Sequence, residues 1–197
     1  MRIYDERNRR LYINASERDR FLKAANEAEP AVRAFCLTLL YTGCRLSEAL
    51  ELSTTSVDPQ SRLISVRTLK KRDLHEVREV PIPPVLADTL AALKQRRIEE
   101  KASDDQQPPP LWTRGGQSLS RVTGYRWIKA VMVEADIYGV QASPKGLRHG
   151  YGVHAIKSGV QLNMLRKWMG HASIATTAIY ANAIGSEELE IADRMWG

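Results

Sequence analysis

The sequence predicts a mainly α-helical protein that carries one small antiparallel β-sheet, an α+β fold. Most of the chain divides into segments in which apolar residues recur at helical spacing. One pair of short segments is rich in β-branched residues, and a polar loop between them indicates a hairpin. The chain shows no internal repeat and no glycine-rich nucleotide loop.

Composition limits the classes of protein that need to be considered. The 197 residues are 43% hydrophobic and 26% charged, which suits one domain with at most a short appendage. Lysine and arginine exceed aspartate and glutamate by 29 − 23 = 6, and this basicity favours a polyanionic partner. The sequence has no apolar run of the roughly 18 residues that a membrane-spanning helix needs, and no signal-peptide core. We therefore expect a cytoplasmic protein with no membrane partner.

The cysteines and histidines give no sign of a metal centre. Cys36 and Cys44 lie in or beside an apolar helical segment, so buried and reduced thiols are expected. The four histidines are scattered and form no cluster with the cysteines. The sequence therefore predicts neither a metal site nor a cofactor.

The N-terminal third should form an arm and two helices. Residues 1–12 are polar and basic and resemble an arm that leads to the fold. Asn14 and Glu17 have the spacing of a capping box, which predicts a helix over residues 15–28. Residues 31–40 are apolar on most sides, as in a helix through the middle of a core, with Gly43 as its C-cap.

A short helix and the hairpin follow. Arg45 starts the helix, and Glu48 lies one turn further on; the simplest interpretation of this pair is an i,i+3 ion pair at the surface. The strands, residues 63–66 and 77–82, flank a basic loop. The cations of that loop are either solvated or reach a nucleic-acid groove beside a phosphate; they are Lys70, Lys71 and Arg72.

The middle of the chain predicts two more amphipathic helices joined by a proline-stiffened linker. The first begins at Pro84, and the linker covers residues 103–110. Ser118 or Ser120 can cap the second helix. Three cations on its polar face suit a phosphate backbone as well as water: Arg121, Arg126 and Lys129.

The C-terminal third contains the candidate nucleophile. A helix opens at Pro144, and we assign its histidines, His149 and His154, to packing. A second helix runs from residue 160 to 169 and ends at Gly170. His171 then lies in a turn, Ser173 can cap the next helix, and Tyr180 follows about two turns into that helix, 180 − 171 = 9 residues after His171. A phenol with a pKa of about 10 needs cationic neighbours before it can act as a nucleophile.

In four motifs the chain resembles the tyrosine recombinases, also called phage-integrase family recombinases, and specifically their catalytic domain. The match covers roughly residues 13–185, and its strength lies in the shared order of the motifs. In chain order they are Thr42-Gly43-Cys44-Arg45-Leu46-Ser47-Glu48, the hairpin Lys70, Leu147-Arg148-His149, and Gly170-His171 with Tyr180.

The resemblance implies the fold of that catalytic domain and a metal-independent, site-specific DNA recombinase. Arg45 and Arg148 would bind the non-bridging oxygens of the scissile phosphate, and His171 would donate a further hydrogen bond. Tyr180 would attack phosphorus to give a 3′-phosphotyrosyl enzyme, and Lys70 would protonate the leaving 5′-oxygen. Glu48 resembles the acidic residue that supports this site. Fixed guanidinium groups suit this chemistry because the phosphodiester is anionic and gains charge in the transition state.

The chain departs from the family at one site position. The family usually has a histidine three residues before the second arginine, where this chain has Lys145. That histidine is commonly assigned the role of proton acceptor toward the tyrosine. We interpret Lys145 as a third phosphate cation rather than a base, because a lysine pKa near 10.4 would have to fall far for general-base catalysis.

The domain pattern also differs from that of most members. We expect a catalytic domain over residues 13–185, no core-binding domain, and a terminal helix over residues 186–197 that is a candidate for exchange between subunits. The short fimbrial DNA invertases have a similar length. The partner would be double-stranded DNA, bound by a tetramer that forms from a monomer in solution. Two other functions remain open at this point: a non-catalytic DNA-binding protein with the recombinase fold, and a type IB topoisomerase.

Overall fold

The computed structural model describes residues 2–68, 76–101, 107–183 and 186–196. Its α-helices are α1 (Ala15–Glu27), α2 (Pro30–Thr42), α3 (Leu46–Leu50), α4 (Pro84–Glu99), α5 (Arg121–Glu134), α6 (Pro144–Lys157), α7 (Leu162–Met169), α8 (Ile174–Ala178) and α9 (Ser186–Ala192). Three short 3₁₀ helices accompany them: η1 (Thr54–Ser56), η2 (Ile179–Asn182) and η3 (Asp193–Met195). The strands are β1 (Val57–Asp58), β2 (Leu63–Arg67), β3 (Val77–Pro81), β4 (Thr113–Arg114) and β5 (Gln117–Ser118). The predicted mainly α fold with a small antiparallel sheet is confirmed.

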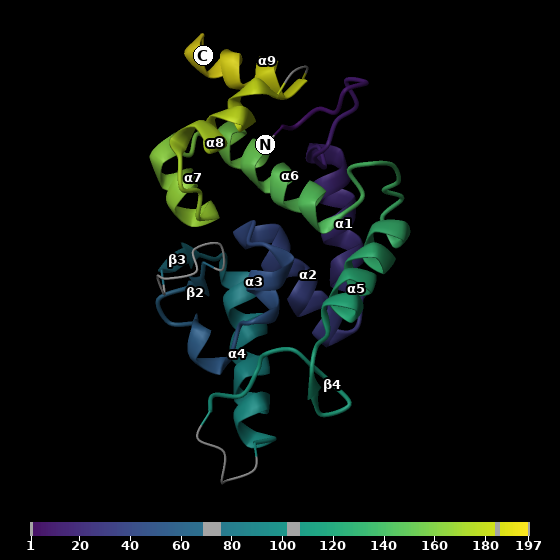
Figure 1. Cartoon of the computed structure of the whole chain (residues 1–197), viewed down its shortest axis with the longest axis vertical. Helices are drawn as coiled ribbons and strands as arrows, with labels where there is room; N and C mark the ends of the chain where they lie inside the picture. The colour runs from purple at the N-terminus through teal and green to yellow at the C-terminus, as the bar shows by residue number, and fades with distance from the viewer. Residues whose placement is uncertain (1, 69–75, 102–106, 184–185, 197) are drawn as a thin grey trace.

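Helix α2 forms the centre of the core. Residues 34–40 are all buried, as expected for a helix that is apolar on most sides, and α1, α4, α5 and α6 pack around it (Figure 1). Cys36 and Cys44 are buried free thiols, as predicted. Gly43 ends α2 in the left-handed conformation, with φ +59°. A Cβ there would lie 2.3 Å from the Tyr151 ring, so this turn, which presents Arg45, requires glycine.

The main sheet has the order β1-β2-β3, with both pairs antiparallel. The register pairs Ile64 with Val80 and Val66 with Arg78. These four side chains are buried on one face of the sheet, which makes Arg78 a charged residue on the core side. The hairpin prediction is therefore confirmed, but its tip, including Lys70, Lys71 and Arg72, lies outside the described residues. A second antiparallel pair, β4 with β5, was not predicted from the sequence.

Both ends of the described chain lie beside α6 (Figure 1). Residues 2–12, predicted as an arm, bury Ile3 and Tyr12 in a cluster that also contains Tyr180. At the other end, α9 packs against α6 of its own chain, where Lys157 forms an ion pair with Glu190. Within the described residues, no helix is both long enough and apolar enough to cross a membrane.

Candidate active site

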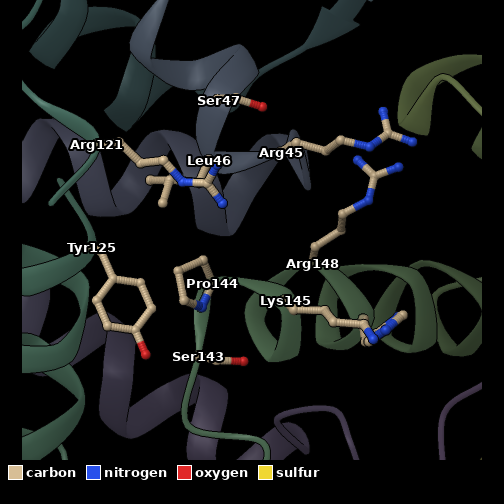
Figure 2. Close-up of a pocket in the computed structure, with 10 residues that line it drawn as sticks. Arg45, Leu46, Ser47, Arg121, Tyr125, Ser143, Pro144, Lys145 and Arg148 are labelled. Atoms are coloured by element: carbon tan, nitrogen blue, oxygen red, sulfur yellow. The ribbon is translucent and has the colours of Figure 1, made fainter. Parts of the chain in front are cut away.

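Two arginines from different parts of the chain line the same cavity, which has a volume of about 430 Å³. Arg45 precedes α3 and Arg148 lies in α6, and Figure 2 shows their guanidinium groups pointing toward one another. Lys145, one turn before Arg148, is exposed and lines the same cavity. On the opposite wall, Arg121 and Tyr125 extend from α5 (Figure 2). The cavity thus gathers cations where an anionic ligand can be bound from several sides.

Two backbone carbonyls accept hydrogen bonds from the guanidinium group of Arg148 and fix its position. Arg148 is 6% exposed, its Nη1 donates to the Gly43 carbonyl and its Nη2 donates to the Met169 carbonyl, both at 2.6 Å. These bonds join α6 to the ends of α2 and α7. Burial and the nearby Arg45 charge lower the pKa of Arg148 to about 10, which still leaves it charged at neutral pH.

Glu48 holds the guanidinium group of Arg45 in place. Its Oε1 accepts from Arg45 Nη1 at 2.6 Å, and its Oε2 accepts from Arg78 Nη2 at 2.7 Å. Glu48 is 1% exposed, so the interpretation of Arg45 and Glu48 as a surface ion pair was wrong. Burial by itself would raise the pKa of Glu48, but the two arginines outweigh it and hold that pKa below its usual value. The carboxylate therefore stays charged and fixes the Arg45 guanidinium at the cavity.

Tyr180 lies in η2 with its ring fully buried. The sequence places it two turns into an α-helix, but α8 ends at Ala178 and the tyrosine follows in 3₁₀ geometry. Its hydroxyl lies 3.3 Å from Nδ1 of His149. The ring packs on Gly152 of α6, where a Cβ would lie 2.6 Å from it. Burial raises the pKa of Tyr180 to about 12, although Arg148 and Arg45 act in the opposite direction.

His171 lies near Tyr180 and near the charges of Arg148 and Arg45. Its ring is stacked near that of Tyr180, with centroids 6.1 Å apart, and its Nδ1 lies 2.9 Å from Oγ1 of Thr177. Burial, with Arg148 and Arg45 next in importance, lowers the pKa of His171 to about 3, so the ring is neutral at neutral pH. Its Nε2 is buried and has no hydrogen-bond partner among the described residues. His171 does not line the cavity, so a ligand there would reach this nitrogen only if the site opened further.

The family model for the phage integrase family matches residues 12–186. The chain belongs to the phage integrase family. It is 32% identical over 176 residues to "Tyrosine recombinase XerD" of Brucella abortus biovar 1 (strain 9-941), and the match covers 84% of this chain and 55% of XerD. It is 28% identical over 166 residues to "Tyrosine recombinase XerA" of Pyrococcus furiosus, with 82% and 54% covered. The chain thus spans about half the length of the curated relatives that it matches.

Two solved structures have the same fold as this chain. The crystal structure of XerA recombinase has a TM-score of 0.80 and 25% identity, and the match covers 94% of this chain and 65% of XerA. The catalytic domain of bacteriophage HP1 integrase has a TM-score of 0.60 and 22% identity, with 93% of both chains covered. The predicted tyrosine recombinase catalytic-domain fold is thus confirmed.

The remaining predicted residues of this phage integrase domain differ in how they relate to the cavity. Arg121 lines it, whereas Arg126 is exposed on α5 outside its lining. Lys129 is partly buried, and its Nζ donates to the Ala142 carbonyl at 2.8 Å, so this ammonium is tied into the fold. Within the described residues, no group of three or more His, Cys, Asp or Glu side chains could hold a metal ion.

Two residues of the site were not predicted from the sequence. Arg78 lies in a predicted strand, and the two-residue period that buries Val80 also points Arg78 inward. His149 was assigned to packing, but it contacts the candidate nucleophile. The sequence does place His149 four residues after Lys145, and this spacing puts both side chains on the same face of α6.

Proposed function

We propose that this chain cuts and rejoins duplex DNA at specific sites, with Tyr180 as nucleophile and a 3′-phosphotyrosyl enzyme as intermediate. The facing guanidinium groups of Arg45 and Arg148, with Lys145 beside them, are the observation that supports this most strongly. A phosphodiester presents two non-bridging oxygens and one negative charge, and the planar guanidinium matches such oxygens in both shape and charge.

The proposed reaction uses these cations where charge develops. Oxygen of Tyr180 attacks phosphorus, the bond from phosphorus to the 5′-oxygen breaks, and the free 5′-hydroxyl is released. Arg45 and Arg148 stabilise the added charge, His171 donates from Nε2, and Lys145 contributes to binding of the phosphate. Loss of one such preorganised donor typically raises the barrier by about 3–4 kcal/mol. The phosphotyrosyl bond conserves the energy of the broken bond, so a different 5′-hydroxyl can religate the strand without ATP.

Two parts of the proposal lie beyond the described geometry. Lys70 is proposed as the acid that protonates the leaving 5′-oxygen, and it belongs to the hairpin tip. Tyr180 is fully buried, so η2 has to move when DNA binds to give the phosphate access to its hydroxyl. A short 3₁₀ segment is suited to such a movement because it contains few internal hydrogen bonds to break.

The proposed DNA surface extends from the cavity along α5. Arg121 and Arg126 are exposed there and would contact the phosphate backbone. Lys71 and Arg72, which lie outside the described residues, are proposed as further phosphate contacts. Lys129 is a weaker candidate because its ammonium already donates to Ala142. XerH, whose fold matches with a TM-score of 0.74 at 19% identity, has been solved bound to its difH substrate. With DNA as its partner, the proposed activity would be cytoplasmic.

We also propose that the catalytic unit covers residues 13–185 and that active assemblies are tetramers on DNA which form from monomers. The end of the chain supports subunit exchange, because Leu189, Met195 and Trp196 are 62%, 76% and 72% exposed. Large apolar side chains that protrude from a terminal helix are suited to docking on a second copy.

A suicide-substrate assay tests the proposed reaction. Nicked duplexes from the genetic neighbourhood of the chain would be incubated with the protein, and denaturing gels would reveal a covalent protein–DNA species. The wild type should form it, and Tyr180→Phe should not. Salt-sensitive DNA binding without any adduct would instead indicate a non-catalytic DNA-binding protein. Relaxation of supercoiled DNA without a specific site would indicate a type IB topoisomerase.

A further inference from the structure

His149 is the described side chain that hydrogen-bonds to the Tyr180 hydroxyl, with 3.3 Å between Nδ1 and Oη. Both residues are buried, at 1% and 0% exposure, and His149 also lines the cationic cavity. We propose that His149 is the catalytic base that takes the proton of Tyr180, in place of the histidine that the family carries at the position of Lys145. This inference rests on the strand-transfer function proposed above.

Hydrogen-bond accounting favours the tautomer that such a base needs. If Nδ1 accepts from the phenol, the neutral ring carries its hydrogen on Nε2, and the buried Tyr180 hydroxyl is satisfied. In the other tautomer Nδ1 donates, which leaves the phenol hydrogen without an acceptor and Nε2 without a donor. Nε2 has no partner among the described residues in either case. The first tautomer therefore leaves fewer buried polar atoms unpaired.

The surrounding charges keep this histidine neutral until substrate arrives. Burial, followed by the charges of Lys145 and Arg148, lowers the pKa of His149 to about 4, so the ring is unprotonated at neutral pH, as a base must be before it takes a proton. The titratable groups that face it are Lys145 and Arg148 on α6, Tyr180 on η2, and His171 after α7. A phosphate bound beside the two cations would offset their charge. The ring thus becomes a stronger base when substrate is bound.

The other candidate bases are less well situated. Nδ1 of His171 is engaged by Thr177, and its ring stacks on the tyrosine instead of reaching the hydroxyl. Lys145 is exposed, and no hydrogen bond joins it to Tyr180 in the described part of the chain. A separation of 3.3 Å is long for this bond, but catalytic hydrogen bonds are often long before substrate binds.

The proposed step balances without a further reactant. The O–H bond of Tyr180 breaks, its proton moves to Nδ1 of His149, and the oxygen electron pair forms the bond to phosphorus. The bond from phosphorus to the 5′-oxygen breaks, and that oxygen takes a proton from the general acid, proposed above as Lys70. In religation the incoming 5′-hydroxyl loses its proton to the acid site, and the His149 imidazolium returns its proton to the departing phenolate.

Two substitutions separate proton transfer from simple positioning. In His149→Asn, the amide oxygen can accept the phenol hydrogen bond at the place of Nδ1 but cannot take the proton. His149→Ala removes both functions. We expect both variants to form the adduct about 10²- to 10⁴-fold more slowly in single turnover, the usual range for loss of a general base. His154→Asn, on the same helix and outside the cavity lining, is the matched control and should react at the wild-type rate.

A change in the nucleophile supplies the decisive measurement. Difluorotyrosine at position 180 ionises more readily, so it should restore most of the rate in His149→Asn and make that rate rise with phenol ionisation. A wild-type rate in His149→Asn would show that His149 only holds the hydroxyl and would overturn the inference. An Asn defect that difluorotyrosine does not relieve would overturn it as well.

A spectroscopic measurement without DNA separates this inference from the proposed function. The ¹⁵N resonance of His149 Nδ1 should have the shift of an unprotonated acceptor and should change in Tyr180→Phe. A protonated Nδ1 would overturn the inference even if the wild type forms the adduct. If the wild type forms no adduct on any duplex, the strand-transfer proposal fails, and the catalytic role of His149 fails with it.

Discussion

The guanidinium of Arg78 on β3 meets the carboxylate of Glu48 on α3 at 2.7 Å, and both side chains are almost completely buried. Arg78 also donates to the Trp168 carbonyl at 2.8 Å and to Thr68 Oγ1 at 3.1 Å. One arginine thus connects the sheet, α3 and the end of α7. Because Glu48 also holds Arg45, this buried pair links the sheet to the cationic cavity.

Arg78→Met should destabilise the protein strongly. The substitution leaves Glu48 with one cation instead of two and frees the Trp168 carbonyl. Breaking a buried pair typically costs about 3–5 kcal/mol, which chemical denaturation would measure. The exposed pair of Arg67 and Glu51, also between the sheet and the α3 region, provides the control. Arg67→Met should cost less than about 1 kcal/mol, and equal losses in the two variants would contradict this account.

Gly152→Ala should disturb Tyr180, because the added Cβ would lie 2.6 Å from its ring. Overpacking of this kind costs about 1–3 kcal/mol. In a Tyr180→Ala background the clash disappears, and the higher helix propensity of alanine should stabilise the protein by about 1 kcal/mol. Thermal unfolding of the wild type, the two single variants and the double variant checks whether Gly152→Ala lowers stability in the presence of Tyr180 and raises it in its absence. A loss of the same size in both backgrounds would show that the ring is not the group that clashes.

Thr177→Val should slow adduct formation by releasing His171. With the Thr177 hydroxyl as the donor to Nδ1, the hydrogen of His171 stays on Nε2, where the phosphate requires it. Loss of one such hydrogen bond is worth about 0.5–1.5 kcal/mol, or roughly 2- to 12-fold in rate. Thr177→Ser keeps the hydroxyl and should retain most of the wild-type rate. Equal single-turnover rates in the valine and serine variants would exclude this role.

Acid should destabilise the protein through three histidines of its described residues. Burial lowers the pKa values of His149 and His154 to about 4 and that of His171 to about 3, while these side chains titrate near 6.5 in the unfolded chain. Below pH 6.5 the unfolded state binds protons that the folded state does not, so stability is lost as pH falls from 6.5 toward these values. Each histidine contributes up to about 1.4 kcal/mol per pH unit in this window. Denaturation between pH 7 and 5 should show a shallower slope in His149→Asn than in the wild type.

The sequence predicts the helices and their ends well, because these follow from local patterns. Asn14 and Glu17 form the predicted capping box, Gly43 ends α2 as predicted, and Ser120 caps α5. The environment of individual side chains was harder to predict. Glu48 has the same i,i+3 spacing from Arg45 at a surface or in a core, and its burial depends on Arg78, 30 residues further on.

The contact between His149 and Tyr180 also depends on residues that are distant in the sequence. The two residues are separated by 31 positions, and they meet because η2 packs on α6 at Gly152. A pattern within one helix reveals that His149 shares a face with Lys145, but it does not reveal which element covers that face. Long-range packing therefore determines the parts of the site that the motifs leave open.

Lys145→Ala should weaken DNA binding and leave the chemistry of proton transfer intact. Lys145 is exposed at the cavity beside Arg148, as expected of a phosphate cation. The logarithm of the DNA-binding constant falls linearly with the logarithm of the salt concentration. Removal of one phosphate contact should make this slope less steep by about 0.9, because one fewer counterion is released on binding. Lys23→Ala removes an equal charge on α1, away from the cavity lining, and should leave that slope unchanged. If Lys145 were the base, its loss would instead abolish adduct formation at saturating DNA, and difluorotyrosine at position 180 would restore it. A reduced salt slope with near-normal saturated rates would support the division of roles proposed here, in which Lys145 binds the phosphate and His149 takes the proton.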